Sequence, residues 1–157
     1  MIPRKGAEVA EITEKNMRDV LEVRKALEEL AVQLACDKIT KEEIEEMKKA
    51  AEDFKKILKS KDITEIAEAD VRFHDIIYMA TDNQKLIQLL NNLREQMYRY
   101  RVEYLKREKA HPQLIAEHAA IIEYISKGEK KAATDIMCKH IDNQVTTVID
   151  VIRTKQN

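Results

Sequence analysis

Apolar residues recur every three or four positions along most of the chain, which is the spacing of an amphipathic helix. Six segments show this pattern, and short polar breaks separate them. The segments cover about 13–37, 40–58, 62–80, 82–104, 111–127 and 129–153. Short connections between amphipathic helices favour antiparallel neighbours. We therefore predict one antiparallel bundle of six to seven helices over residues 13–157.

Several helix ends are marked by capping residues. Thr40 and Glu43 form a capping box, in which a hydroxyl and a carboxylate each accept a hydrogen bond from a free backbone N–H. Asp62 gives a similar signal for the third helix. Pro112 is favoured in the first turn of a helix, and Gly128 is favoured just after the end of one. These residues predict where the second, third and fifth helices begin and where the fifth ends.

Composition supports an all-α fold. The 157 residues include 2 Gly and 2 Pro, which are too few to form the turns of an all-β or α/β fold. A chain of this length buries roughly 70% of the surface that its unfolded form exposes, so its core needs neither a metal nor a disulfide.

Charge and hydropathy limit the partners of the chain. There are 28 Lys and Arg against 29 Asp and Glu, with the signs interspersed, so the net charge is −1. A stand-alone nucleic-acid-binding protein usually carries a basic excess. No stretch approaches the eighteen or so apolar residues of a membrane span. We expect a soluble, cytoplasmic protein that binds no membrane.

Four polar residues interrupt the apolar faces of the predicted helices. Asp70 and His74 lie one turn apart on the third helix, on the face that should be buried. His118 lies in the middle of the apolar stripe of the fifth helix, and His140 does so on the sixth. We therefore expect these four side chains to point into one core.

Two explanations fit these residues. Burying an unpaired carboxylate or imidazole costs roughly several kcal/mol, so the four groups need partners. A divalent transition metal is one explanation, because imidazoles and one carboxylate suit Zn, Mn, Ni, Co or Fe, whereas Ca and Mg prefer oxygen ligands. The other is a buried polar network in which Asp70 accepts hydrogen bonds from two histidines.

Two arginines are candidates for binding a carboxylate. Arg24 lies on the apolar stripe of the first helix, and Arg101 continues the stripe of the fourth helix. A guanidinium group matches a carboxylate with two parallel hydrogen bonds. The alternative for Arg24 is an arginine paired with a buried acid, such as Asp70, or one that extends to solvent. Arg94 and Arg99 on the fourth helix are weaker candidates.

Taken together, several sequence segments resemble one known family. They are VRKALE at 23–28, ADVRFHDIIYMATDNQKLIQLL at 69–90, and EHAAIIEYISKGEKKAATDIMCKH at 117–140. This combination, with Asp70-x-x-x-His74, His118 and His140, resembles the C-terminal ligand-binding (FCD) domain of FadR-subfamily regulators in the GntR superfamily. The resemblance covers nearly the whole chain.

The resemblance implies a site and a function. In the metal-binding branch of the family, the positions of Asp70, His74, His118 and His140 hold a divalent ion in a central pocket. We expect zinc first, with nickel, manganese, cobalt and iron as other candidates. Effectors in the family are commonly small carboxylates, which Arg24 and Arg101 would bind here. The complete metal set argues against acyl-CoA.

The resemblance also implies the rest of the regulator. Residues 1–12 look like the last wing strand and linker of a winged-helix DNA-binding domain, and the rest of that domain is absent. We expect a homodimeric effector-sensing domain of a bacterial transcription regulator, which contacts operator DNA only through the missing N-terminal domain.

Two other functions remain open from the sequence. A metal-bound water on a helical bundle could make the chain a hydrolase. However, no general base stands at a recognisable spacing, and Val71 and Ile115 occupy the positions where Glu-x-x-His pairs of di-iron bundles have glutamate. The second alternative is a structural helical dimer with a buried polar network. We expect no enzymatic activity.

Overall fold

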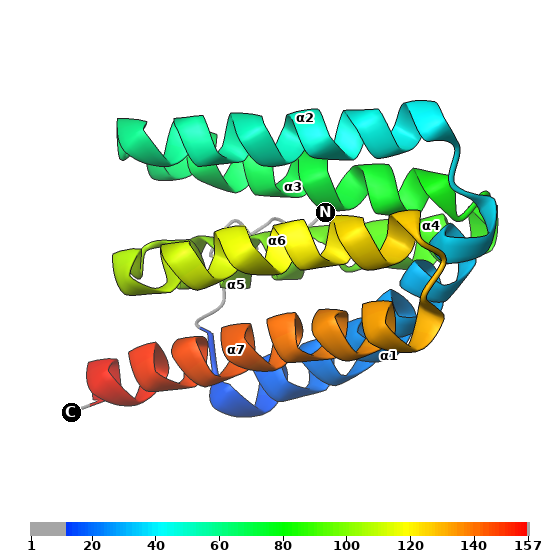
Figure 1. Ribbon diagram of the computed structural model, residues 1–157. Coiled ribbons are helices and arrows are strands. Elements are labelled where there is room, and N and C mark those ends of the chain that lie inside the picture. Colours follow the sequence, from blue (N-terminus) through cyan, green and yellow to red (C-terminus); the bar gives the residue numbers. More distant parts are fainter. Residues whose placement is uncertain (1–11, 157) are drawn as a thin grey trace, which may run out of the picture.

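The chain folds as an antiparallel bundle of α-helices. The computed structural model describes residues 12–156, where it contains seven α-helices, two short 3-10 helices and no strand. The α-helices are α1 (Glu14–Lys38), α2 (Lys41–Ile57), α3 (Ile63–Ala80), α4 (Gln84–Asn92), α5 (Arg94–Leu105), α6 (His111–Ser126) and α7 (Lys130–Gln156). Successive long helices alternate in direction, and α1 lies beside α7 (Figure 1). The predicted all-α class is confirmed.

Part of the sequence prediction cannot be compared with this fold. Of the predicted wing strand and linker at 1–12, residues 1–11 lie outside the described part of the chain. Within the described part, no helix is long and apolar enough to cross a membrane.

The predicted helix ends are confirmed by their hydrogen bonds. The backbone N–H of Thr40 donates to Glu43 Oε1 at 2.9 Å, and the backbone N–H of Glu43 donates to Thr40 Oγ1 at 3.1 Å. Asp62 accepts from two backbone N–H groups in the first turn of α3. Gly128 has φ of 70° and follows the end of α6. Local capping chemistry therefore sets the lengths of α2, α3 and α6.

The prediction of one continuous helix over 82–104 is wrong, because this segment forms two helices, α4 and α5. The helical conformation is interrupted at Leu93, where φ is −98° and ψ is −1°. The next helix, α5, begins directly after Leu93 and has no side-chain cap. Both helices bury the same side, as Leu90 before the break and Met97 after it show. The apolar pattern therefore runs through the break, and no Gly or Pro marks it.

A layer of polar side chains divides the core into two apolar clusters. Along each of three helices, the chain passes from a residue of one cluster to a buried polar residue and then to a residue of the other cluster. The three sequences are Ala69–Asp70–Phe73 on α3, Leu114–His118–Ile121 on α6 and Ile141–Gln144–Val148 on α7. The bundle therefore brings polar residues from separate helices to one level, between two apolar ends.

We expect Gly128→Ala to lower the free energy of unfolding by roughly 1 kcal/mol, because an L-residue is strained in the left-handed region. The added methyl group itself would meet only the Cys36 carbonyl oxygen at 3.8 Å, so the effect would come from the backbone. Urea denaturation measures it. Lys61→Gly is the matched control, because Lys61 has φ of 60° and gains a residue suited to that conformation. Equal stability of Gly128→Ala and the native chain would contradict this account.

Candidate metal centre

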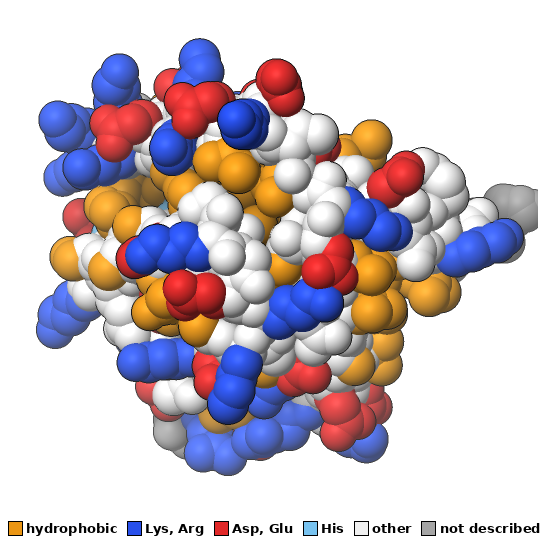
Figure 2. Space-filling model, turned by 45° about the vertical axis from the view of Figure 1, so that its right-hand side comes forward, with side chains coloured by type: hydrophobic (Ala, Val, Ile, Leu, Met, Phe, Trp, Pro, Cys, Tyr) orange, Lys and Arg blue, Asp and Glu red, His pale blue; other side chains and the backbone are white. Residues whose placement is uncertain are grey.

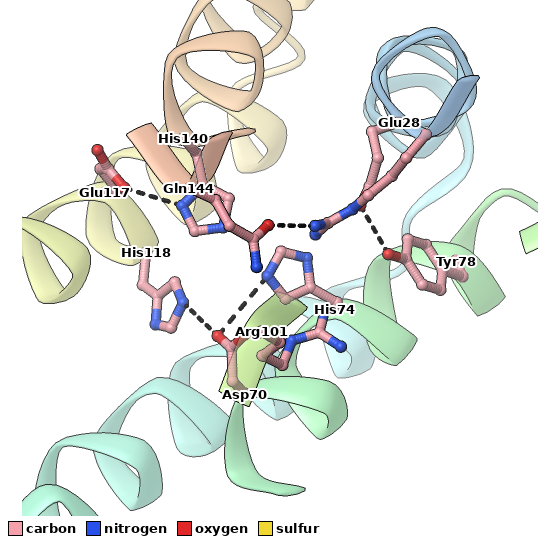
Figure 3. A network of polar contacts seen from close by, with 10 residues as sticks. Glu28, Asp70, His74, Tyr78, Arg101, Glu117, His118, His140 and Gln144 are labelled. Atoms are coloured by element: carbon pink, nitrogen blue, oxygen red, sulfur yellow. Dashed lines mark hydrogen bonds and ion pairs between the residues drawn. The ribbon is translucent and has the colours of Figure 1, made fainter. Parts of the chain in front are cut away.

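The carboxylate of Asp70 is the central group of the polar layer. Its Oδ2 accepts a hydrogen bond from Arg101 Nε at 2.6 Å, and its Oδ1 accepts one from His118 Nε2 at 3.0 Å. His74 Nε2 lies 3.7 Å from the same Oδ1. Figure 3 shows His74 and His118 approaching Asp70 from one side. One oxygen of Asp70 is therefore held by a guanidinium group, and the other faces two imidazoles.

Three of the four predicted ligands form a compact group. One ligand atom each from Asp70, His74 and His118 lies within 4.8 Å of the others, and all three residues are buried. Neither ring nitrogen of His74 has a hydrogen-bond partner among the described residues, and His118 Nδ1 also has none. Buried polar atoms without partners are rare in folded proteins. A metal ion would use nitrogen atoms such as those of His74, so this residue fits the predicted ligand chemistry.

His140, the fourth predicted ligand, lies beside this group and not within it. Its ring stacks on that of His74 with centroids 5.2 Å apart. Its Nδ1 lies 2.8 Å from Glu117 Oε1, and the other oxygen of Glu117 accepts a hydrogen bond from Asn143 at 2.7 Å. Metal-binding histidines commonly donate their second nitrogen to a carboxylate in this way, which fixes the ring and leaves Nε2 for the metal.

The ionisation states in this layer also suit a metal. Burial opposes ionisation of Asp70, but the neighbouring His74, His118 and Arg101 outweigh it and hold the pKa of this carboxyl well below its usual range. Burial lowers the pKa of His74 well below its usual range and that of His118 more moderately. A neutral imidazole and an ionised carboxylate are the forms that bind metal.

Arg24 belongs to a second buried network next to the histidines. Its Nε donates to Glu28 Oε2 at 3.0 Å, and its Nη1 donates to Gln144. The Tyr78 hydroxyl donates to the same oxygen of Glu28 at 2.8 Å, while Glu28 Oε1 is buried without a partner. Burial and the charge of Glu28 raise the pKa of Tyr78 well above its usual range. Arg24 is thus paired with a buried acid, which is Glu28 and not Asp70.

Both predicted carboxylate-binding arginines therefore already have protein partners, Arg24 in Glu28 and Arg101 in Asp70. The weaker candidate Arg94 lies at the surface, with its guanidinium group 3.0 Å from Asp75. An effector can use Arg101 only if the guanidinium group changes partner or offers its remaining N–H groups.

A narrow crevice between α3 and α5 leads to this layer. His74, Tyr78 and Arg101 line it, and its volume is about 10 Å³, which is room for about one water molecule. Asp75 and Arg94 also line it, and their ion pair is at the surface. In this arrangement of the helices, the crevice itself is too small for an organic ligand.

The sequence did not predict Glu28, Glu117 or Gln144 as members of the site. A signal was present for Glu28, which stands four residues after Arg24 and can therefore pair with it on one helix face. Glu117 contacts His140 on another helix, so only the packing of α6 against α7 reveals it. Leu30, predicted on the buried stripe of the first helix, is instead 42% exposed.

The fold and this layer define the chain as a helical domain with a nitrogen-rich polar centre. The chain matches the model of the FCD domain family over residues 19–143 and belongs to that family. The predicted resemblance is thus confirmed at the level of the family.

Similar proteins are described as regulators. The chain is 26% identical over 141 residues to the uncharacterized HTH-type transcriptional regulator YdhC of Bacillus subtilis (strain 168), with 89% of this chain and 63% of that protein covered. The fold is similar to that of Streptococcus agalactiae GntR, with a TM-score of 0.74, 21% identity, and 90% and 64% of the two chains covered. It is also similar to a GntR family transcriptional regulator from Pseudomonas syringae pv. tomato str. DC3000, with a TM-score of 0.71, 18% identity, and 94% and 61% covered. The chain spans less than two thirds of the length of each.

We expect the metal-free protein to lose stability as the pH falls below about 6.5, the ordinary pKa of histidine. Unfolded chains take up protons at His74 and His118 there, whereas burial keeps both neutral in the folded state. The folded state binds fewer protons, so the free energy of unfolding falls by about 1.4 kcal/mol per pH unit for each histidine. Denaturation with urea in the presence of a chelator measures the slope.

His74→Gln is the companion variant, because it removes one of the two groups. We expect it to reduce the slope by about half or more, because the pKa of His74 is lowered further than that of His118. A free energy of unfolding that does not change between about pH 7.5 and about pH 5.5 would contradict the assignment of two neutral buried histidines.

Proposed function

We propose that this domain is the sensor of a transcription regulator, which binds a divalent transition metal and a small carboxylate effector. Asp70, His74, His118 and His140 would hold the metal, with zinc as the first candidate. When bound, the metal supplies a positive centre to which a carboxylate can coordinate. The protein does this without enzymatic turnover, in keeping with relatives described as regulators.

The unpartnered ring nitrogens of His74, which lies beside Asp70 and His118, are the observation that carries the proposal. The buried charges support it. Among the described residues, two buried arginines stand against three buried carboxylates, those of Glu28, Asp70 and Glu117. Counted by formal charge and without the histidines, these five side chains have one excess negative charge. A buried uncompensated charge is costly, and a divalent cation would leave one positive charge in its place.

That remaining positive charge supports a monoanionic acid as effector. The acid would enter beside His74 and Arg101, where Arg101 orients Asp70 through Nε. Because the crevice holds no more than about one water molecule, the acid must bind an arrangement in which α3 and α5 lie further apart. A ligand that prefers one of two arrangements shifts the equilibrium between them, which is the physical requirement for sensing.

The remaining parts of the proposal concern partners. The curated relative is described as helix-turn-helix type and extends beyond the matched part, which supports a DNA-binding segment working with this domain. Exposed apolar side chains on α1 and α4 support a homodimer, in which a second copy would cover them; they are Val23, Leu30 and Leu89.

Metal titration of chelator-stripped protein tests the centre. Isothermal titration with Zn²⁺, Ni²⁺ and Mn²⁺, with metal content checked by mass spectrometry, should show stoichiometric binding to the native chain. His118→Ala and His140→Ala should abolish it. Glu117→Gln should weaken it by roughly 10- to 100-fold, because the carboxylate that orients His140 is lost. His111→Ala is the control, because this histidine contacts the Leu105 carbonyl oxygen and lies outside the layer. Full metal content in both alanine variants would refute the site.

A thermal-shift screen of small organic acids tests the effector class. Monocarboxylates, dicarboxylates and sugar acids are compared on metal-loaded and stripped protein, with the neutral amides of the same acids as controls. At a concentration of 100 Kd, a ligand stabilises the folded state by about 2.7 kcal/mol, which is readily detected. We expect monocarboxylates to stabilise only the loaded protein. A screen without any metal-dependent stabilisation would refute the carboxylate proposal.

A further inference from the structure

A second hollow, a groove between α2 and α6, also reaches the polar layer. Its volume is about 310 Å³, far larger than that of the crevice between α3 and α5. Lys48, Glu52 and Lys55 from α2 line it with more than half of each side chain exposed, and His118 from α6 lines it while almost fully buried. In Figure 2, charged side chains gather at the top of the molecule, where α2 lies, above apolar surface. The groove therefore runs from a charged rim to a buried imidazole.

His118, which lines the inner end of the groove, has a ring nitrogen without a partner. His118 uses Nε2 to contact Asp70, and its Nδ1 has no hydrogen bond with any described residue. Its ring is held by Phe73, which stacks on it with centroids 4.1 Å apart, and by Phe54, whose edge contact has centroids 4.9 Å apart. The ring therefore has a fixed orientation, and its Nδ1 is buried and without a partner.

The rim of the groove suits a single negative charge. Lys48 and Lys55 face one acid, Glu52, among the lining residues. Both lysines form ion pairs at the surface: Lys55 Nζ lies 4.0 Å from Glu52 and Lys48 Nζ lies 3.2 Å from Glu45, and all four side chains are more than half exposed. Exposed pairs of this kind contribute little, so both ammonium groups can turn to a bound anion at small cost.

We propose that the groove between α2 and α6 binds a small monocarboxylate with an apolar body, whose affinity depends on the metal centre through His118. This rests on the proposed function for its dependence on metal. The lysines attract the carboxylate, Ala51 and Ala119 leave room for the apolar body, and His118 Nδ1 contacts the acid. This site is separate from the crevice beside Arg101.

The two nitrogens of His118 supply the coupling. In the metal-free protein Nε2 donates its hydrogen to the carboxylate oxygen of Asp70 at 3.0 Å, so Nδ1 is a bare acceptor. A carboxylate is repelled by a bare acceptor. If a metal takes the place of that hydrogen on Nε2, the neutral ring carries its hydrogen on Nδ1 and donates to the carboxylate. Metal and acid then strengthen each other equally, because coupling between two sites is reciprocal.

Fluorine NMR with 4-fluorobenzoate as the probe tests the proposal on Zn²⁺-loaded and metal-free protein. We expect binding to the loaded protein that is weaker by about 10-fold or more without metal, the effect of losing a hydrogen bond to a charged group. Lys48→Ala and Lys55→Ala should each weaken it by roughly 2- to 5-fold. Ala119→Leu, at an exposed position, should abolish it by filling the groove.

Matched controls separate the groove from general effects. Lys49→Ala changes an exposed lysine of α2 that lies outside the groove, and Ala116→Leu adds the same bulk elsewhere on α6. Both should bind the probe as the native chain does. The uncharged 4-fluorobenzamide should bind more weakly and should not respond to the lysine variants. Metal stoichiometry and circular dichroism of each variant are measured alongside.

The possible results test separately the location of the acid site, its coupling to the metal, and the metal centre itself. Binding that is unchanged by Lys48→Ala, Lys55→Ala and Ala119→Leu would overturn the groove as the site. Lysine-dependent binding with equal affinity for loaded and stripped protein would overturn the coupling through His118. Absence of stoichiometric metal binding would overturn the proposed function, and the lysine and leucine variants would still decide whether the groove binds the acid.

Discussion

The buried carboxylate of Asp70 is the constraint on which the rest of the polar layer depends. An uncompensated charge in this position would cost roughly several kcal/mol, so groups from other helices must reach it. Arg101 does so from α5 and His118 from α6. These contacts fix the levels at which α5 and α6 pack against α3. The apolar residues on both sides of the layer must therefore pack in a way that keeps Asp70 within reach of its partners.

A layer of this composition is an unusual choice for stability alone. Apolar residues of similar volume often replace buried ion pairs without loss of stability, and here they would also remove the unpartnered atoms of His74 and Glu28. The apolar clusters on both sides already supply a core. The polar layer thus adds groups suited to binding a ligand to a bundle that already has an apolar core at both ends. A binding role accounts for this better than a structural one.

How much of this could be read from the sequence depends on how local each feature is. Helices follow from the apolar period and from caps such as Thr40 and Asp62, and the pairing of Asp70 with His74 follows from their spacing on one helix. The break at Leu93 leaves no trace in the pattern. The contact of Arg101 with Asp70 joins separate helices and depends on how they pack.

Exposure was hardest to predict where a helix contacts several neighbours. On α1, Glu28 is fully buried and Leu30 is largely exposed, the reverse of what their polarity suggests. Burial of Glu28 follows from Arg24 and Tyr78, one on its own helix and one on α3. The period of a helix gives the direction of a side chain, but only its partners decide whether a charge in that direction can be buried.

The two hollows differ in a way that bears on sensing. The groove between α2 and α6 is open in this arrangement, whereas the crevice between α3 and α5 has almost no free volume. A ligand in the groove would find space without separating α2 from α6, and His118 is the residue of the centre that lines this groove. A ligand in the crevice must separate α5 from α3, and α5 also packs against α1 and α7. Of the two, the crevice is therefore the one from which binding could move the first helix. Under the proposals above, a ligand in the groove would change only the affinity of the centre for its metal.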